Sequence, residues 1–170
     1  MRRAIHFAIA LAAICAAASL SCFAADAVQV QIDSRKAGPR SMEPLTERAV
    51  LRDYRFAWAS MARALEFNSL DPLQGPFEGD AQQWLKNSVL SQQQSGLSQR
   101  YVGQDHRVEA VFYSPEGDVL ELHDTVEYQL QVSAGGKIVH DDHLTMHYVV
   151  LMTPGADRWV IRQLQAVPRF

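Results

Sequence analysis

The spacing of apolar residues changes at Gly96, and this change limits the folds that are open to the chain. Before Gly96, apolar residues recur at intervals of three and four, which is typical of amphipathic helices. After Gly96 they alternate with polar residues, which is typical of strands with one buried face. Helices followed by consecutive strands favour an α+β domain with an antiparallel sheet over βαβ units with a parallel sheet.

The part before Gly96 predicts two helices. The long one begins near Pro44 and continues to about residue 67, and Ser41 or Thr46 is expected to cap its N-terminus. The second helix covers residues 81–94, and Gly96 follows it as a residue type that commonly ends helices. The long helix has a single apolar stripe at helical spacing, formed by Val50, Tyr54, Ala57, Met61 and Leu65 and widened by Trp58 and Ala62.

The part after Gly96 predicts consecutive strands that are joined by short turns. Their residues are 98–105, 107–113, 119–132, 137–152 and 158–167. A short additional strand is expected around Val30, where apolar residues alternate ahead of a linker that contains glycine and proline. We therefore expect a strand and linker over residues 25–43 and one α+β domain over residues 44–167, with four to six strands.

The two longest strands can be paired on their apolar rows. A two-residue turn would set each apolar row against a polar one, whereas a three-residue loop over 134–136 restores the match. The three-residue loop predicts that these residues lie opposite each other: Val126 and Leu144, Leu122 and Tyr148, Asp124 and Met146, Glu127 and His143, His123 and His147.

The segment "HDDHLTMHYVV" (residues 140–150) places histidines on the polar face of this hairpin. One interpretation is a face exposed to water or to a partner, because antiparallel sheets commonly expose one side. A homodimer could form through such a face. The other interpretation is a zinc or copper site, since these metals take imidazole and carboxylate ligands. The candidate ligands are His123, His143 and His147, together with Glu127 or Glu121.

Asp124 interrupts the apolar row between Leu122 and Val126. A buried carboxylate is costly unless it accepts hydrogen bonds. The donors could be a backbone N–H, an arginine of the long helix, or the indole of Trp58 or Trp84. The other interpretation is that Asp124 lies in a pocket and acts as a general base. The candidate pocket residues are Asp124, Tyr128, Asp142, Met146, Tyr148, Tyr54 and Trp58.

The first residues have the organisation of a secretory signal peptide over residues 1–24. Arg2 and Arg3 precede an apolar run over residues 4–20, and small residues lead to Ala24. The mature protein is therefore expected in the periplasm or outside the cell, without a membrane span and without cysteine. The alternative is a lipid anchor on Cys22.

The remaining composition excludes several functions. The net charge is -3 and no basic patch is present, so nucleic acid is not an expected partner. The sequence has neither a glycine-rich phosphate loop nor a nucleophile elbow, and no cofactor is expected. Trp58, Trp84 and Trp159 lie at spacings that predict core positions.

Four features together resemble the nuclear transport factor 2-like (SnoaL-like) superfamily. They are the turn "SPEGD" (residues 114–118), the long strand that follows it, the glycine turn at 135–136, and a last strand with Trp159 and Ile161. Within this superfamily, these features most resemble the intermembrane-space-like domains of plastid and bacterial division or scaffold proteins. The resemblance covers residues 43–167 and implies a curved sheet that wraps the long helix around a conical pocket.

The resemblance does not by itself assign an activity. Enzymes of this superfamily, which include isomerases, dehydratases and hydrolases, use inward carboxylates, tyrosines and histidines, while many members only bind. This chain has one inward acid and no inward histidine in the long hairpin. We therefore expect a non-catalytic domain that binds a small hydrophobic molecule or a protein partner. The alternative is an isomerase, dehydratase or hydrolase with Asp124 as general base.

Overall fold

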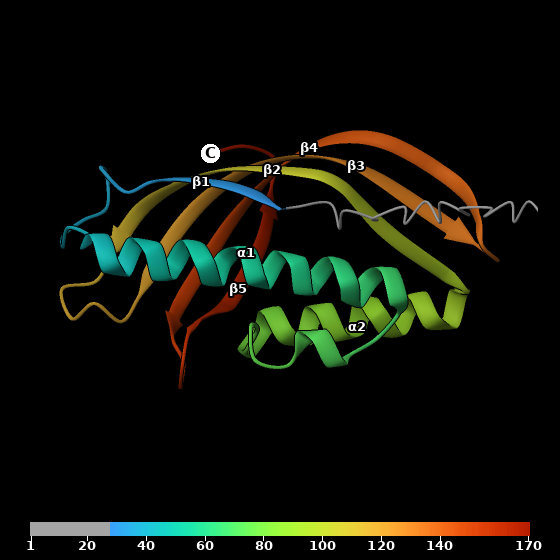
Figure 1. Ribbon diagram of the computed structural model, residues 1–170, viewed down its shortest axis with the longest axis horizontal. Coiled ribbons are helices and arrows are strands. Elements are labelled where there is room, and N and C mark those ends of the chain that lie inside the picture. The colour runs from blue at the N-terminus through green and yellow to red at the C-terminus, as the bar shows by residue number, and fades with distance from the viewer. Residues whose placement is uncertain (1–27) are drawn as a thin grey trace, which may run out of the picture.

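The computed structural model describes residues 28–170. The predicted signal peptide, Cys22 and the first linker residues lie outside the described residues. The described part is an α+β domain in which two helices pack on one curved sheet, as predicted (Figure 1). Its helices are α1 (Pro44–Phe67), the short 3₁₀ helix η1 (Asp71–Leu73) and α2 (Gly79–Ser95). Its strands are β1 (Gln29–Asp33), β2 (Leu97–Tyr113), β3 (Leu120–Ala134), β4 (Lys137–Pro154) and β5 (Trp159–Val167).

The strands of the described part follow each other in the sheet in chain order. Strands β2 to β5 pair antiparallel, as expected, but β1 pairs parallel to β2, so the sheet is mixed. The two strands predicted over 98–113 are one strand, with an irregularity between Val102 and Asp105. Gly103 adopts a φ of 65° at this point, which lets β2 bend without breaking.

The sheet arches over α1, which runs along its concave side, and α2 lies beside α1 (Figure 1). Every residue of the predicted α1 stripe is buried except Ala62, which is partly buried. These side chains meet an apolar row of the sheet that contains Leu120, Leu122, Val126 and Val150. The core therefore lies between α1 and the concave face.

The helix ends agree with the prediction in part. Helix α1 begins at Pro44, but its N-cap is Glu43, and no side chain caps it, so the expected caps Ser41 and Thr46 are wrong. Proline suits this position because the first N–H of a helix has no partner within the helix. Gly96 ends α2 in the left-handed conformation, as predicted. No helix among residues 28–170 is long and apolar enough to span a membrane.

The β3–β4 hairpin turns over two residues, Gly135 and Gly136, and not over the predicted three. An irregularity follows, because Ser133 pairs with Ile138 while Val132 pairs with His140, so Val139 is the extra residue of a bulge. The bulge sets the apolar row of β3 opposite the apolar row of β4, which a two-residue turn alone would not do. The predicted faces are therefore correct, but each predicted partner is displaced by two residues.

The displaced register changes every pair that we predicted across the hairpin. On the apolar face, the pairs are Leu122 with Val150, Asp124 with Tyr148, and Val126 with Met146. On the polar face, they are His123 with Val149, Thr125 with His147, Glu127 with Thr145, and Gln129 with His143. The predicted opposition of His123 to His147 and of Glu127 to His143 is wrong.

Candidate functional site

Asp124 lies fully buried on the concave face of β3 and joins three elements. The hydroxyl of Tyr54, on α1, donates to its Oδ2 at 2.7 Å. The Nδ1 atom of His106, on β2, lies 2.7 Å from the same oxygen, and His106 is also fully buried. Neither partner is among the donors expected from the sequence. His106 was not predicted as a partner, because it falls between the strands predicted over 98–105 and 107–113.

Aromatic rings enclose this polar cluster. Trp58 lies with its ring centroid 4.5 Å from that of His106 and 5.3 Å from that of Tyr148. Burial, followed by the negative charge and hydrogen bond of Asp124, raises the pKa of the Tyr54 hydroxyl well above its usual range. Tyr54 therefore stays protonated and remains a donor to Asp124. The cluster ties α1 to the sheet from inside the core.

The other predicted pocket residues do not gather around Asp124. Tyr128 is buried against Tyr101, with 4.9 Å between ring centroids. Met146 is only half-buried. Asp142 is exposed and its carboxylate lies 3.0 Å from His140 Nε2. The structure thus brings together Asp124, Tyr54, Trp58 and Tyr148, places Tyr128 beside Tyr148, and leaves Asp142 and Met146 apart.

The histidines of the polar face are dispersed. His123 lies 3.2 Å from a carboxylate oxygen of Glu121 and stacks on Phe170, with 4.3 Å between ring centroids. His147 Nδ1 lies 3.0 Å from the hydroxyl of Thr125. Within residues 28–170, no three His, Cys, Asp or Glu side chains are arranged to hold a metal ion.

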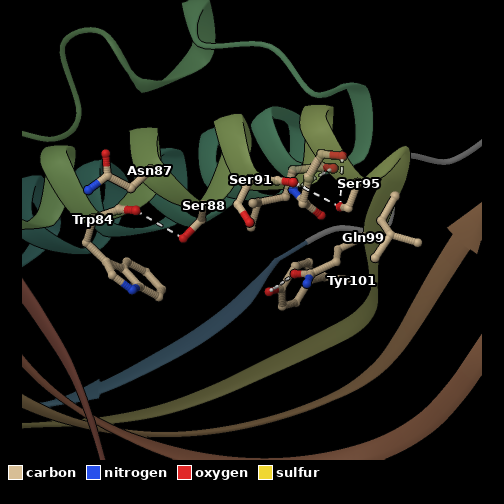
Figure 2. A pocket seen from close by; sticks show the side chains of 10 residues that line it. Trp84, Asn87, Ser88, Ser91, Ser95, Gln99 and Tyr101 are labelled. Atoms are coloured by element: carbon tan, nitrogen blue, oxygen red, sulfur yellow. Dashed lines mark hydrogen bonds between the residues drawn. The ribbon is translucent and has the colours of Figure 1, made fainter.

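A groove with a volume of about 540 Å³ lies between α2 and the first residues of β2 (Figure 2). Trp84 lies toward one end of it, and Gln99 and Tyr101 lie toward the other. Ser88, Ser91 and Ser95 follow α2 between these ends, as Figure 2 shows. The lining consists of Leu65, Trp84, Asn87, Ser88, Ser91, Gln92, Ser95, Leu97, Gln99 and Tyr101. It contains no acidic or basic side chain.

Local sequence explains how α2 forms one wall. Residues 84, 88, 91 and 95 are separated by four, three and four positions, which places them on one face of a helix. Ser88 and Ser95 donate to the carbonyls of Trp84 and Ser91, respectively, one turn earlier, at 3.0 and 2.9 Å. These bonds fix the hydroxyls while leaving their oxygen atoms able to accept a hydrogen bond.

One groove residue is buried with an unused acceptor. The side chain of Gln92 is 7 % exposed, and its Nε2 lies 3.5 Å from the carbonyl oxygen of Leu65. Its Oε1 has no hydrogen-bond partner among the described residues. A buried carbonyl oxygen without a donor is uncommon and costs free energy.

The sequence did not predict this groove. We expected Trp84 to be a core residue, but 48 % of its surface is exposed. The helical spacing of the α2 serines is the signal that could have revealed it. A helix face that packs on a core is normally apolar, so a row of serines indicates a face that is not packed on the core. None of the pocket residues predicted around Asp124 lines the groove.

No protein-family model and no curated protein matches this chain. Among solved structures, the chain is similar to the intermembrane space region of the chloroplast protein ARC6, with a TM-score of 0.59. The identity is 15 %, and the similarity covers 76 % of this chain and 98 % of that one. The similarity is one of fold, and it confirms at that level the resemblance to intermembrane-space-like domains. The wider superfamily stays a prediction.

Proposed function

We propose that this chain is a non-catalytic binding domain outside the cytoplasm, and that its ligand occupies the groove between α2 and β2. The observation that carries the proposal is the groove itself, with an exposed tryptophan at one end and serine hydroxyls along its helical wall. Its volume of about 540 Å³ lies within the range of about 300–1,000 Å³ that is common for ligand sites.

The groove is suited to binding and not to proton transfer. General acid–base catalysis needs a side chain that exchanges a proton near the working pH. Tyr101 is the one lining residue with an ionisable group, and burial raises the pKa of its hydroxyl well above the usual range. That hydroxyl donates to Oε1 of Gln99 at 3.2 Å and stays protonated. Asp124, the base of the alternative hypothesis, is fully buried and outside this lining.

The location rests on the predicted signal peptide over residues 1–24. A protein released from it begins at Ala25, in the periplasm or outside the cell. The mass of the protein purified from the cell envelope tests this. A mass that includes residues 1–24 would contradict export with cleavage, and a lipid mass on Cys22 would place the protein at a membrane surface.

Blocking the groove tests the binding site. Ser91 is exposed within the groove, so Ser91→Trp fills it without disturbing the core. Gln94→Trp is the matched control, because Gln94 is exposed on the same helix outside the lining. Protein purified from its own cells is measured by native mass spectrometry, which also reports whether two copies associate. We expect a bound molecule on the wild type and the control only, and an equally occupied Ser91→Trp variant would contradict the proposal.

A further inference from the structure

We propose that the ligand of the groove is a neutral saccharide. This inference rests on the proposed function, because it names the chemical class of the molecule that the groove would bind. Three properties of the lining carry it: the absence of charge, the mixture of donors and acceptors, and the aromatic rings toward its two ends.

The lining favours an uncharged ligand. An ionic group that leaves water needs an opposite charge or several charge-assisted hydrogen bonds. None of the ten lining residues carries a charge to pair with it. Phosphate, carboxylate and ammonium ligands would therefore lose solvation in the groove without compensation.

The polar groups of the groove match hydroxyls, which both donate and accept. Oδ1 of Asn87 already accepts from Nε2 of Gln83 at 3.0 Å, so the amide nitrogen of Asn87 is available to donate. Oε1 of Gln99 accepts from Tyr101, so its amide nitrogen is likewise a donor. The acceptors are the hydroxyl oxygens of the serines.

The aromatic rings of Trp84 and Tyr101 supply apolar contact surface in the same groove. Trp84 projects from α2, and Tyr101 projects from β2 near the opposite end (Figure 2). From Trp84 to Ser95 the helix rises about 16 Å, at about 1.5 Å per residue, so the wall is long enough for a chain of several sugar rings. The C–H faces of pyranose rings pack on aromatic rings while their hydroxyls point sideways, toward such amides and hydroxyls.

A peptide is a poorer match to this wall. Peptide grooves rely on apolar anchor pockets, on clusters of arginine, or on a sheet edge. The helical side of this groove presents mainly serine and asparagine, and the aliphatic lining residues are Leu65 and Leu97 alone. An uncharged peptide is nevertheless the competitor that the experiment has to separate.

The test is isothermal calorimetry with the whole purified protein and defined probes. The probes are neutral trisaccharides of glucose and of N-acetylglucosamine, the acidic trisaccharide of galacturonic acid, and an uncharged heptapeptide capped at both ends. We expect at least one neutral saccharide to bind, and the acidic one to bind at least about tenfold more weakly, which corresponds to about 1.4 kcal/mol.

Variants of Trp84 locate the binding. Trp84→Ala removes the ring and should weaken saccharide binding by about tenfold or more, a loss of about 1.4 kcal/mol. Trp84→Phe keeps a ring and should retain most of the affinity while removing the tryptophan fluorescence change on binding. Leu90→Ala is the control, because Leu90 is exposed on α2 outside the lining and should bind like the wild type.

The outcomes separate the two proposals. If no neutral saccharide binds at millimolar concentration, or if Trp84→Ala binds it like the wild type, the saccharide inference is wrong. If the capped peptide binds and depends on Trp84, the inference is wrong while the groove remains the binding site. If Ser91→Trp also leaves the native bound molecule in place, the proposed function fails as well.

Discussion

His106 Nδ1 lies 2.7 Å from Asp124 Oδ2, with both side chains fully buried. The two residues come from neighbouring strands, β2 and β3, and the hydroxyl of Tyr54 reaches the same oxygen from α1. One carboxylate oxygen thus links the helix to two strands. The arrangement favours the structural interpretation of Asp124 over the catalytic one, because water does not reach the side chain.

Replacing Asp124 should therefore destabilise the fold. Asp124→Ala leaves the Tyr54 hydroxyl without its acceptor and deprives His106 of its buried partner, and an unsatisfied buried polar group costs about 1–3 kcal/mol. We expect the free energy of unfolding to fall by about 2–5 kcal/mol in urea titrations. Asp142→Ala is the control, because Asp142 is exposed, and it should change stability by no more than about 0.5 kcal/mol. Equal effects of the two variants would contradict this role.

The buried tyrosines predict a loss of stability at high pH. Burial, together with neighbouring Tyr128, raises the pKa of both Tyr101 and Tyr148 well above the usual range. In the unfolded chain, tyrosine titrates near pH 10, so the stabilisation is complete below about pH 10 and is lost as the pH rises further. Tyrosinate absorbance should show these residues ionising only as the protein unfolds. Ionisation of all five tyrosines in folded protein near pH 10 would contradict this.

The hairpin register can be tested by cross-linking. In a chain whose Cys15 and Cys22 are replaced by serine, Glu127→Cys with Thr145→Cys should form a disulfide readily, because these residues are directly opposed and exposed. Directly opposed Cβ atoms lie about 4.5–5.5 Å apart. Glu127→Cys with His143→Cys is the control pair, displaced by two residues. Faster oxidation of the control pair would show that the bulge at Val139 is absent.

Asp53 should stabilise the packing of α1 on β5. Its carboxylate accepts from the backbone N–H of Trp159 at 2.9 Å and lies 2.7 Å from Arg52 Nε, while 5 % of the side chain is exposed. Asp53→Ala leaves that N–H without an acceptor. We therefore expect the free energy of unfolding to fall by about 1–3 kcal/mol in chemical denaturation. Asp157→Ala, at an exposed carboxylate nearby, should lose no more than about 0.5 kcal/mol. An Asp53→Ala variant with unchanged stability would refute the role of Asp53 in holding α1 against β5.

Local patterns were sufficient to predict the elements and their buried faces. The α1 stripe and the inward rows of β3 and β4 follow from periods of 3.6 and 2, which act within each element. The parallel direction of β1 and the bulge at Val139 were not predictable in this way. Strand direction leaves no trace in an alternating pattern, and a bulge changes partners while it preserves the faces.

The candidate site was harder to predict because it depends on what each helix face meets. Trp84 has the same position in the apolar pattern of α2 whether its side chain packs in the core or borders a groove. Its exposure follows from where β2 begins after Gly96 and from how far the sheet curves away from α2, both of which are properties of the whole fold. The partners of Asp124 were not predicted for a similar reason, since Tyr54 and His106 lie 70 and 18 residues earlier in the chain.

Hydrogen–deuterium exchange measures most directly whether the groove is the binding site. Protein isolated from its own cells is compared with the same protein after unfolding, removal of bound molecules and refolding. We predict slower exchange in the isolated protein across α2 and the first residues of β2, approximately residues 84–101, and no such difference for Ser91→Trp. Identical exchange over this segment, with protection instead on the histidine face of β3 and β4, would contradict the assignment of the groove.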